Sequence, residues 1–265
     1  MLGAIIGDIA GSRFEGNNIK SKEFELFTSE CKPTDDSIMT LAVAKAILSC
    51  DTMNLSQLEE KSVVCMQELG RRYPYAGYGG LFWLWLWQAV PQPYESYGNG
   101  AAMRVSPCAY AADSLEEAEA LARAVTEVTH NHPEGIKGAQ AATAAIFMAL
   151  HGSSISEIHD YLDQNYYSMN FTLEEIRPWY RFDVSCQGSV PQAIMAFLES
   201  TSFEDAIRNA ISIGGDSDTI GAITGSIAEA YYGIPIDIRN QAVRYLDKFQ
   251  IDILNRFEGE YGAIR

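Results

Sequence analysis

The chain has 265 residues, of which 47% are hydrophobic and 20% charged, and its formal net charge at pH 7 is −16. This acidic excess excludes general affinity for a nucleic-acid backbone or an anionic membrane, because basic residues supply that binding. An anionic small ligand is compatible with it if metal ions or backbone amides provide local positive charge. The five cysteines show no paired spacing, which predicts reduced thiols and a cytoplasmic location.

The apolar start of the chain is expected to be a helix and not a signal peptide, because an aspartate interrupts it and no basic segment precedes it. Glycines recur in it every four residues, at Gly3, Gly7 and Gly11, and Gly221 and Gly225 repeat that spacing later in the chain. A glycine inside a helix costs roughly 1 kcal/mol relative to alanine, so the repetition needs a structural reason. We expect these two helices to pack closely at the centre of the fold.

Helical periodicity dominates the rest of the chain. Four capping-box signatures predict helix starts: Ser56 with Glu59, Ser114 with Glu117, Ser154 with Glu157, and Thr172 with Glu175. Further helices are expected at about 36–50, 134–151, 189–200, 203–212, 218–232 and 236–256.

The Trp-rich segment from Leu81 to Val90 is too short to span a bilayer. We expect it to form buried core or a pocket wall, and Leu81 to Trp87 is the best candidate for a strand, although its length leaves helix and strand both open. No linker, repeat or low-complexity tract divides the chain. The sequence therefore predicts one all-α domain over residues 1–265.

Two acidic clusters lie far apart in the chain, Thr34-Asp35-Asp36 and Asp216-Ser217-Asp218-Thr219. Each opens a helix-forming run, so helix capping alone explains either cluster taken separately. The same composition occurs twice, however, and four neighbouring carboxylates would repel one another unless cations balanced them. Carboxylate and hydroxyl oxygens are the ligands that Mg²⁺ and Mn²⁺ prefer. We therefore expect the two clusters to form one site for two divalent cations.

Two loops are further candidates for ligand binding. The first, Ser96 to Gly100, runs into a helical segment whose amides could hold phosphate oxygens, although the segment taken alone favours a plain turn. Within it, Tyr97 could stack on a base or close a pocket. In the second, His130 and His132 lie between helices, where metal ligation and hydrogen bonding are both open. We favour a pocket hydrogen bond from His130.

Together these motifs resemble the ADP-ribosylglycohydrolase family, which includes ADP-ribosylarginine and ADP-ribosylserine hydrolases and the dinitrogenase-reductase-activating glycohydrolase. The resemblance runs almost end to end. It rests on Gly7-Asp8 through Glu15, Thr34-Asp35-Asp36, Gly77-Tyr78-Gly79, Gly98-Asn99-Gly100 to Arg104, Thr129-His130, and Ile213 to Gly221. Several ordered motifs together are specific, whereas any one of them alone would not be.

The resemblance implies an orthogonal helix bundle that holds two divalent cations, Mg²⁺ or Mn²⁺. The implied metal ligands are Thr34, Asp35, Asp36, Asp216, Asp218 and Thr219. The implied catalytic carboxylates are Asp35, Asp36 and Glu15, of which Glu15 either ligates a metal or gates entry. The implied contacts with ADP-ribose are Gly77, Tyr78, Gly79, Ser96, Tyr97, Gly98, Asn99, Gly100 and His130.

The reaction expected from this resemblance is metal-dependent hydrolysis of the glycosidic bond between C1″ of ADP-ribose and an acceptor nitrogen or oxygen, which reverses ADP-ribosylation. Two alternatives stay open: a dimetal phosphohydrolase that cuts a nucleotide pyrophosphate, and a non-catalytic binder of ADP-ribose. The expected partner is ADP-ribose or an ADP-ribosylated protein or small molecule. A monomer is favoured.

Overall fold

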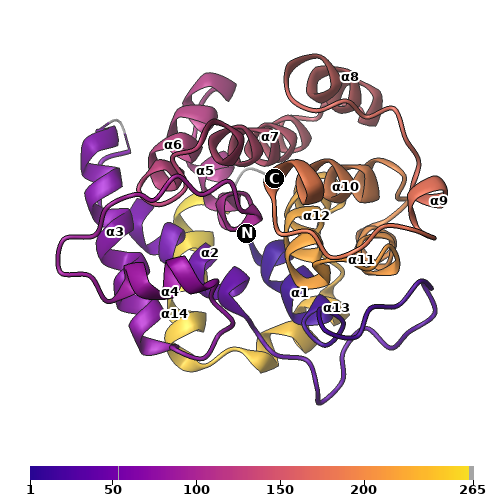
Figure 1. The fold of residues 1–265 in the computed structure, drawn as a ribbon, viewed down its shortest axis with the longest axis horizontal. Helices are drawn as coiled ribbons and strands as arrows, with labels where there is room; N and C mark the ends of the chain where they lie inside the picture. Colours follow the sequence, from indigo (N-terminus) through magenta and orange to yellow (C-terminus); the bar gives the residue numbers. More distant parts are fainter. Residues whose placement is uncertain (53, 263–265) are drawn as a thin grey trace.

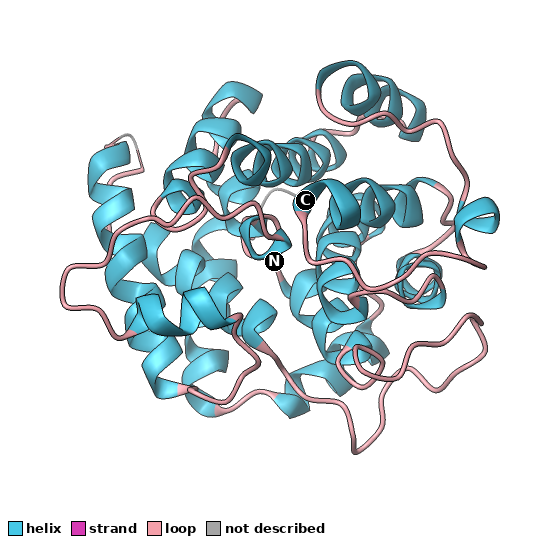
Figure 2. Ribbon diagram, viewed as in Figure 1, coloured by secondary structure: helices cyan, strands magenta, loops and turns pink. Residues whose placement is uncertain are grey.

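A computed structural model of the chain describes residues 1–52 and 54–262. Within these residues the secondary structure consists of fourteen α-helices and two short 3₁₀-helices, with no β-strand (Figures 1 and 2). The one isolated β-bridge in the described ranges pairs Gly98 with Ser185. The predicted all-α fold class is therefore confirmed.

The helices are named in chain order. In the first half they are α1 (Leu2–Gly11), α2 (Asp35–Ile47), α3 (Leu55–Arg72), α4 (Gly80–Leu86), η1 (Asn99–Ala101), α5 (Ser106–Ala111) and α6 (Leu115–Glu127). In the second half they are α7 (Pro133–Leu150), α8 (Ile155–Asn165), α9 (Leu173–Ile176), α10 (Cys186–Leu198), α11 (Phe203–Ser212), α12 (Ser217–Tyr232), α13 (Ile236–Ala242), η2 (Val243–Tyr245) and α14 (Lys248–Tyr261).

Helices α1 and α12 pack against each other through their glycines near the centre of the molecule (Figure 1). A Cβ atom added to Gly7 would overlap the backbone carbonyl of Gly221, and one added to Gly3 would overlap that of Gly225. The helices can approach this closely only because neither carries a side chain there. The close packing expected from the glycine spacing is confirmed. It also brings the end of α1, at Gly11, against the first turn of α12.

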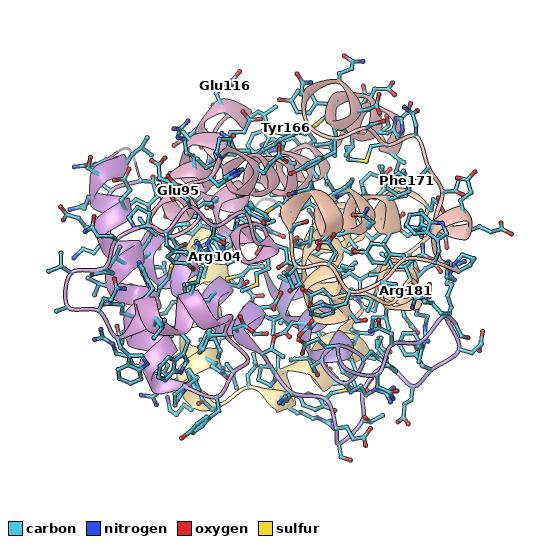
Figure 3. The ribbon with its side chains drawn as sticks, viewed as in Figure 1. Glu95, Arg104, Glu116, Tyr166, Phe171 and Arg181 are labelled. Atoms are coloured by element: carbon cyan, nitrogen blue, oxygen red, sulfur yellow. The ribbon has the colours of Figure 1, made fainter. Side chains whose placement is uncertain are left out.

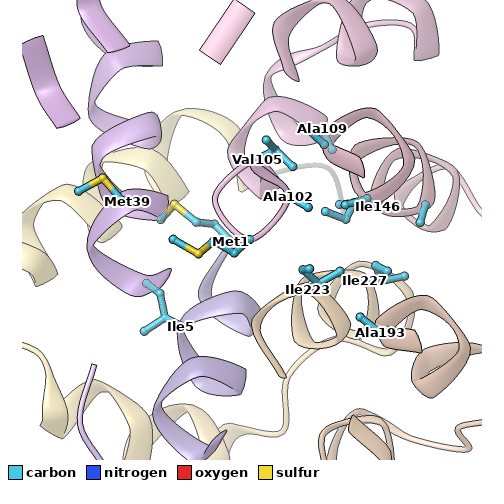
Figure 4. Packing of buried hydrophobic residues seen from close by; sticks show 14 of the residues in the cluster. Met1, Ile5, Met39, Ala102, Val105, Ala109, Ile146, Ala193, Ile223 and Ile227 are labelled. Carbon is cyan, nitrogen blue, oxygen red and sulfur yellow. The ribbon is translucent and has the colours of Figure 1, made fainter. Parts of the chain in front are cut away.

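The hydrophobic core surrounds this helix pair. Every residue of α1 is buried, and so is most of α12. Figure 4 shows Ile5 of α1, Met39 of α2, Ile146 of α7, Ala193 of α10 and Ile223 of α12 converging on one cluster. Because α1, α2 and α12 are central helices buried on nearly all sides, any carboxylate that they carry into this region is taken out of water.

Most of the helices expected from the sequence are present. The expected spans over 36–50, 134–151, 189–200, 203–212 and 218–232 correspond to α2, α7, α10, α11 and α12. The capping boxes at Ser154 and Thr172 are complete. Ser114 caps α6, but the Glu117 side chain accepts from the amide of Asp113 in place of Ser114.

Two expectations about the helices were wrong. Asn54 and not Ser56 caps α3, because the Asn54 side chain accepts from the amide of Gln57. The helix expected over 236–256 is interrupted, since Asp247 forms a new capping box with Gln250 and starts α14.

The Trp-rich segment, for which helix and strand were both open, forms helix α4. Phe82, Trp85 and Leu86 are buried on one face of it, while Leu81 is 62% exposed and Trp87 51% exposed. This spacing of buried residues is that of a single-sided helix, so the segment contributes to the core through one face.

Among the described helices, none is long and apolar enough to cross a membrane. All five cysteines are unbonded, as their spacing predicted.

Candidate active site

The first turns of α2 and α12 share one pocket, which has a volume of about 420 Å³ and is lined by both acidic clusters. The hydroxyl of Thr219 donates to Oδ2 of Asp36 at 3.3 Å, which joins the two clusters directly. Asp218 lines the same cavity. Two segments separated by about 180 residues in the sequence are therefore neighbours in the fold, and the glycine contact between α1 and α12 holds them there.

Five carboxylates form two overlapping groups at this pocket, four of them in its lining and Asp8 buried behind it. One oxygen each from Asp8, Asp36 and Asp218 lies within 4.8 Å of the others, and the same holds for Glu15, Asp216 and Asp218. Asp218 therefore belongs to both groups. The ion pairs that the described residues form include none of these five side chains. Among the described residues, Lys32 acts on Glu15 only from beyond ion-pair distance.

Burial and mutual repulsion disfavour the charged forms of these carboxylates, and their pKa values are raised accordingly. Burial raises the pKa values of Asp36 and Asp218 well above their usual range, and neighbouring carboxylates raise them further. Burial raises the pKa of Asp8 to about 6. Burial, with the Asp8 carboxylate next in importance, raises the pKa of Asp35 to about 8. Each charged form loses hydration and faces like charges, so bound cations would stabilise the ionised cluster.

The donor atoms suit hard divalent cations. Oδ1 of Asp36 is buried and has no hydrogen-bond partner among the described residues, so one lone-pair-bearing oxygen is left for a ligand. The hydroxyls of Thr34 and Thr219 lie beside the other oxygen of Asp36, at 3.3 Å each. A set made only of carboxylate and hydroxyl oxygens is the chemistry that Mg²⁺ or Mn²⁺ prefers. The residues present therefore fit such cations.

Asp8 supports the start of α2 from behind. It accepts hydrogen bonds from the amide and hydroxyl of Thr34 at 2.9 and 2.6 Å. It also accepts from the amide of Ser37 at 3.0 Å and from its hydroxyl. Asp8 was not predicted from the sequence to belong to the site. Its position did carry a signal, because a carboxylate inside an otherwise apolar, glycine-containing helix needs a polar or ionic partner.

The start of α12 is held in a different way. Gly214 and Gly215 adopt positive φ angles of 69° and 79°, which form the turn before the helix. Asn18 pairs with Gly215 in both directions: its Nδ2 donates to the Gly215 carbonyl at 2.9 Å, and its Oδ1 accepts from the Gly215 amide at 2.8 Å. Asn99 Nδ2 donates to Oδ2 of Asp216 at 2.7 Å. The side chain of Asn99 is therefore directed at the acidic centre.

Most residues implied by the family resemblance line this pocket. They are Glu15, Asp35, Asp36, Gly77, Gly79, Ser96, Gly98, Asn99, Gly100, His130, Asp216, Asp218 and Thr219. Three others do not line it. Thr34 lies behind Asp36, Tyr78 packs against Phe82 at a ring distance of 5.6 Å, and Tyr97 is half exposed with its ring against His132.

Several lining residues were not predicted from the sequence. They are Met39, Gly80, Tyr94, Met103, Arg104, Phe182 and Val184, of which Met103 and Arg104 belong to a motif. Leu81 and Phe82 also line the pocket, in agreement with the expectation that the Trp-rich segment forms core or a pocket wall. The two histidines lie outside both carboxylate groups. His132 instead caps α7 by accepting from the amide of Glu134.

A second cavity, of about 370 Å³, is lined by Met1 and by residues of α12 and α14 among others. Its charged groups are already paired, since Arg239 forms an ion pair with Glu258. It contains neither of the two carboxylate groups. We therefore place the functional site in the acidic pocket.

The fold and this pocket define a class: an all-helical protein with an oxygen-lined acidic centre between two helix starts. A model of the ADP-ribosylglycohydrolase family matches residues 1–261. The chain belongs to the ADP-ribosylglycohydrolase family, and the resemblance inferred from its motifs is confirmed.

Individual relatives agree with this assignment. The ADP-ribosylhydrolase ARH3 of Homo sapiens is 26% identical over 314 aligned positions, which cover 88% of this chain and 84% of that protein. The ADP-ribosyl-[dinitrogen reductase] glycohydrolase of Rhodospirillum rubrum is 23% identical, with 76% and 69% covered. A solved structure described as an ADP-ribosylglycohydrolase-related protein complex superposes with a TM-score of 0.69 at 22% identity, and covers 100% of this chain and 96% of that one. That likeness shows a shared fold.

Proposed function

We propose that this pocket hydrolyses the glycosidic bond that joins C1″ of ADP-ribose to an acceptor nitrogen or oxygen. The observation that carries the proposal is the pair of carboxylate groups that share Asp218 within one pocket. Relatives over most of the chain are named as hydrolases of ADP-ribosyl linkages, which supports the same reaction class.

The proposed cofactors are two divalent cations, Mg²⁺ or Mn²⁺. The residues that would hold them are Thr34, Asp35, Asp36, Asp216, Asp218 and Thr219, with Glu15 and Asp8 completing the two carboxylate groups. When bound, such cations lower the pKa of a bound water and balance the charge of the surrounding carboxylates.

The protein's own groups orient the site and move protons. Asp8 and Asn99 fix the two helix starts, so the ligand oxygens are held in place before substrate arrives. Glu15 and Asp35 both line the pocket. In this proposal one of them takes a proton from the attacking water and the other delivers a proton to the leaving acceptor. The anionic centre also stabilises positive charge that develops at C1″ in the transition state.

The rest of the pocket is suited to the nucleotide and the acceptor. Gly77, Gly79, Gly98 and Gly100 line it without side chains, so a ligand can approach their backbone amides. The exposed side chains of Leu81, Phe182 and Val184 also line it. We assign these apolar residues to the mouth, where the acceptor would leave the pocket.

A panel of ADP-ribosylated acceptors tests the proposal. The purified protein is incubated with arginine-linked, serine-linked, nucleobase-linked and O-acyl-linked ADP-ribose, with and without Mg²⁺ or Mn²⁺, and the products are identified by mass spectrometry. Release of intact ADP-ribose from at least one acceptor, lost after EDTA treatment, is expected. AMP with ribose phosphate would instead identify a phosphohydrolase. Binding of ADP-ribose with no product from any acceptor would identify a non-catalytic binder.

A further inference from the structure

Glu15 is the one exposed member of the two carboxylate groups. It lies in the loop over residues 12–34, between α1 and α2, and none of the ion pairs formed by the described residues includes it. Yet one of its carboxylate oxygens lies within 4.8 Å of oxygens from Asp216 and Asp218. Like charges this close repel one another, so the position of Glu15 depends on contacts made elsewhere in its segment.

Asn18 supplies such contacts. Its Nδ2 donates to the carbonyl of Phe14 at 2.6 Å and, over a longer distance, to that of Glu15 at 3.2 Å. The same nitrogen donates to the Gly215 carbonyl at 2.9 Å, and Oδ1 accepts from the Gly215 amide at 2.8 Å. A carboxamide has two N–H donors and one carbonyl oxygen, so these bonds engage both halves of the group. One side chain therefore joins the backbone at Glu15 to the turn that precedes Asp216.

The turn at Gly214 and Gly215 is enclosed between this side chain and a tyrosine ring. A Cβ atom built on Gly214 would lie 3.2 Å from Oδ1 of Asn18, and one built on Gly215 would overlap the ring of Tyr180. The Tyr180 hydroxyl in turn donates to a backbone carbonyl of α10 at 2.6 Å, which fixes the ring. The turn is therefore a rigid support against which Asn18 can hold the loop.

Lys20 adds a second link from the same loop. Its Nζ donates to the carbonyl of Tyr180 at 2.7 Å and to that of Ile213, the residue before the glycine turn. Figure 3 places Arg181, the residue after Tyr180, on the side of the molecule where this loop passes. The loop is therefore tied both to the turn before α12 and to the segment that follows α9.

The outer part of the loop is held separately by α11, beside which it passes (Figure 1). Lys22 forms an ion pair with Asp205, and Arg208 Nη1 donates to the carbonyls of Lys22 and Phe24 at 2.9 and 2.7 Å. These contacts do not involve Asn18. Removal of the Asn18 side chain should therefore leave the loop attached to the fold and release only its inner part.

We propose that Asn18 is a positioning residue for the carboxylate group of Glu15, Asp216 and Asp218. By tying the backbone at Glu15 to the turn at Gly215, its side chain holds the Glu15 carboxylate beside the other two. Asn18 is not among the residues that line the pocket, so it acts through Glu15 and contacts no ligand itself. The inference rests on the proposed function, because that function assigns cations to this carboxylate group.

A matched pair of variants tests the role of Asn18. Asn18→Ala removes the side chain that joins the two backbones. Asn17→Ala is the control, because Asn17 is exposed in the same loop and its bond to the Phe14 carbonyl comes from the backbone amide, which the substitution keeps. Mn²⁺ binding is measured by calorimetry. Asn18→Ala should weaken one of two Mn²⁺ sites about tenfold and change the other by less than about twofold, whereas Asn17→Ala should bind like the wild type.

A double-mutant cycle with Glu15→Gln separates the positioning of Glu15 from a general effect on the fold. Because Asn18 acts through Glu15, adding Asn18→Ala to the Glu15→Gln variant should cost less than about twofold in Mn²⁺ affinity. An equal loss in both backgrounds would show that Asn18 acts on the turn alone, and would overturn the proposal. Equal weakening of both Mn²⁺ sites, the result expected of a merely structural residue, would overturn it as well.

A measurement without metal decides the case if the wild type binds no Mn²⁺. In crystal structures of the metal-free variants, the carboxylate oxygens of Glu15 and Asp218 should stay within 4.8 Å in Asn17→Ala and lie farther apart in Asn18→Ala. An unchanged distance in Asn18→Ala would contradict the positioning role. If Asn18→Ala does not fold, Asn18→Ser replaces it in each measurement, because the short serine side chain cannot bridge both backbones.

These results are separable from a failure of the proposed reaction. A protein that cleaves no acceptor, but in which Asn18→Ala weakens one Mn²⁺ site or displaces Glu15, would remove the reaction and keep the positioning role. Release of ADP-ribose by the wild type, together with two unchanged Mn²⁺ sites in Asn18→Ala, would keep the reaction and remove the positioning role.

Discussion

The starts of α2 and α12 carry the same residue types, yet the structure satisfies them differently. At α2, the Thr34 side chain accepts from the amide of Asp36 and is a normal helix cap, with Asp8 bonded behind it. At α12, Asp216 occupies the capping position without a side-chain capping bond. Its carboxylate accepts from Asn99 instead.

This difference shows which of the two clusters helix capping can explain. Capping accounts for Thr34, whose side chain bonds the first turn of α2. It does not account for Asp36, Asp216 and Asp218, whose carboxylates are buried among other carboxylates, and two of these three lie at the start of α12. The start of α12 therefore indicates a ligand more strongly than the start of α2. Substitutions at the two helix starts, and at the helix contact that joins them, test this difference.

The largest effect is expected at Asp218, which belongs to both carboxylate groups. Asp218→Asn keeps the shape and removes the charge. We expect turnover to fall by about 10³-fold or more and Mn²⁺ affinity, measured by calorimetry, to fall by at least about 100-fold. The melting temperature of the metal-free variant should equal or exceed that of the wild type, because a repelling buried carboxylate is gone.

The exposed residue Asp237 on α13 provides the control for this substitution. Asp237→Asn makes the same chemical change away from the pocket and should leave Mn²⁺ affinity unchanged. An Asp218→Asn protein that binds Mn²⁺ as tightly as Asp237→Asn would contradict the shared role of Asp218.

The next effect concerns the helix contact that brings the two starts together. Gly7→Ala would place a methyl group inside the backbone of Gly221, so we expect a loss of about 3 kcal/mol or more in the free energy of unfolding. Gly259→Ala in α14 is the matched control, because nothing lies within 4 Å of its added Cβ. It should raise stability by about 0.5–1 kcal/mol. Urea unfolding of both variants measures the contrast, and similar values for the two would refute the packing argument.

The sequence was sufficient to predict parts of the molecule whose cause is local or periodic. The spacing of Gly3, Gly7 and Gly11 predicted the close helix contact, and the capping boxes at Ser154 and Thr172 predicted two helix starts. The order of motifs predicted the family, because a set of ordered motifs is far more specific than any single one.

What could not be predicted depends on contacts between distant segments. The pairing of Asn18 with Gly215 joins residues separated by 197 positions, and nothing in either local sequence announces it. The same is true of the burial of Arg104 beside Thr129. In α4 the difficulty was different, because seven residues are too few for a helical period to be distinguished from a strand.

A smaller effect should appear in the pH dependence of metal-free stability. Asp8 and Asp35 have pKa values raised to about 6 and about 8, above those of an unfolded chain. The stability that these two protonated carboxyl groups give the folded state is therefore fully present below about pH 4. It is lost as pH rises through these pKa values, because the folded state must then release protons that stabilised it. Added Mg²⁺ competes with these protons. We expect the rise in melting temperature caused by Mg²⁺ to grow by about 2–6 °C between pH 5 and pH 8.5.

Parallel scans with and without Mg²⁺ at each pH isolate this effect from the titration of other groups. A Mg²⁺-dependent increase that is the same at pH 5 and pH 8.5 would show that cations and protons do not compete for the carboxylates.

The smallest effect compares the two threonines directly. Thr34→Val removes the cap of α2 and a donor to Asp8, so the metal-free protein should lose about 1–2 kcal/mol of stability. Thr219→Val removes a hydroxyl that caps nothing and touches Asp36 at 3.3 Å. It should lower the free energy of unfolding, measured with urea, by no more than about 0.5–1 kcal/mol. It should nevertheless weaken Mn²⁺ binding about tenfold. Equal losses of stability in the two variants would mean that the start of α12 is stabilised in the same way as that of α2, and the distinction between a capped start and a ligand-binding start would fail.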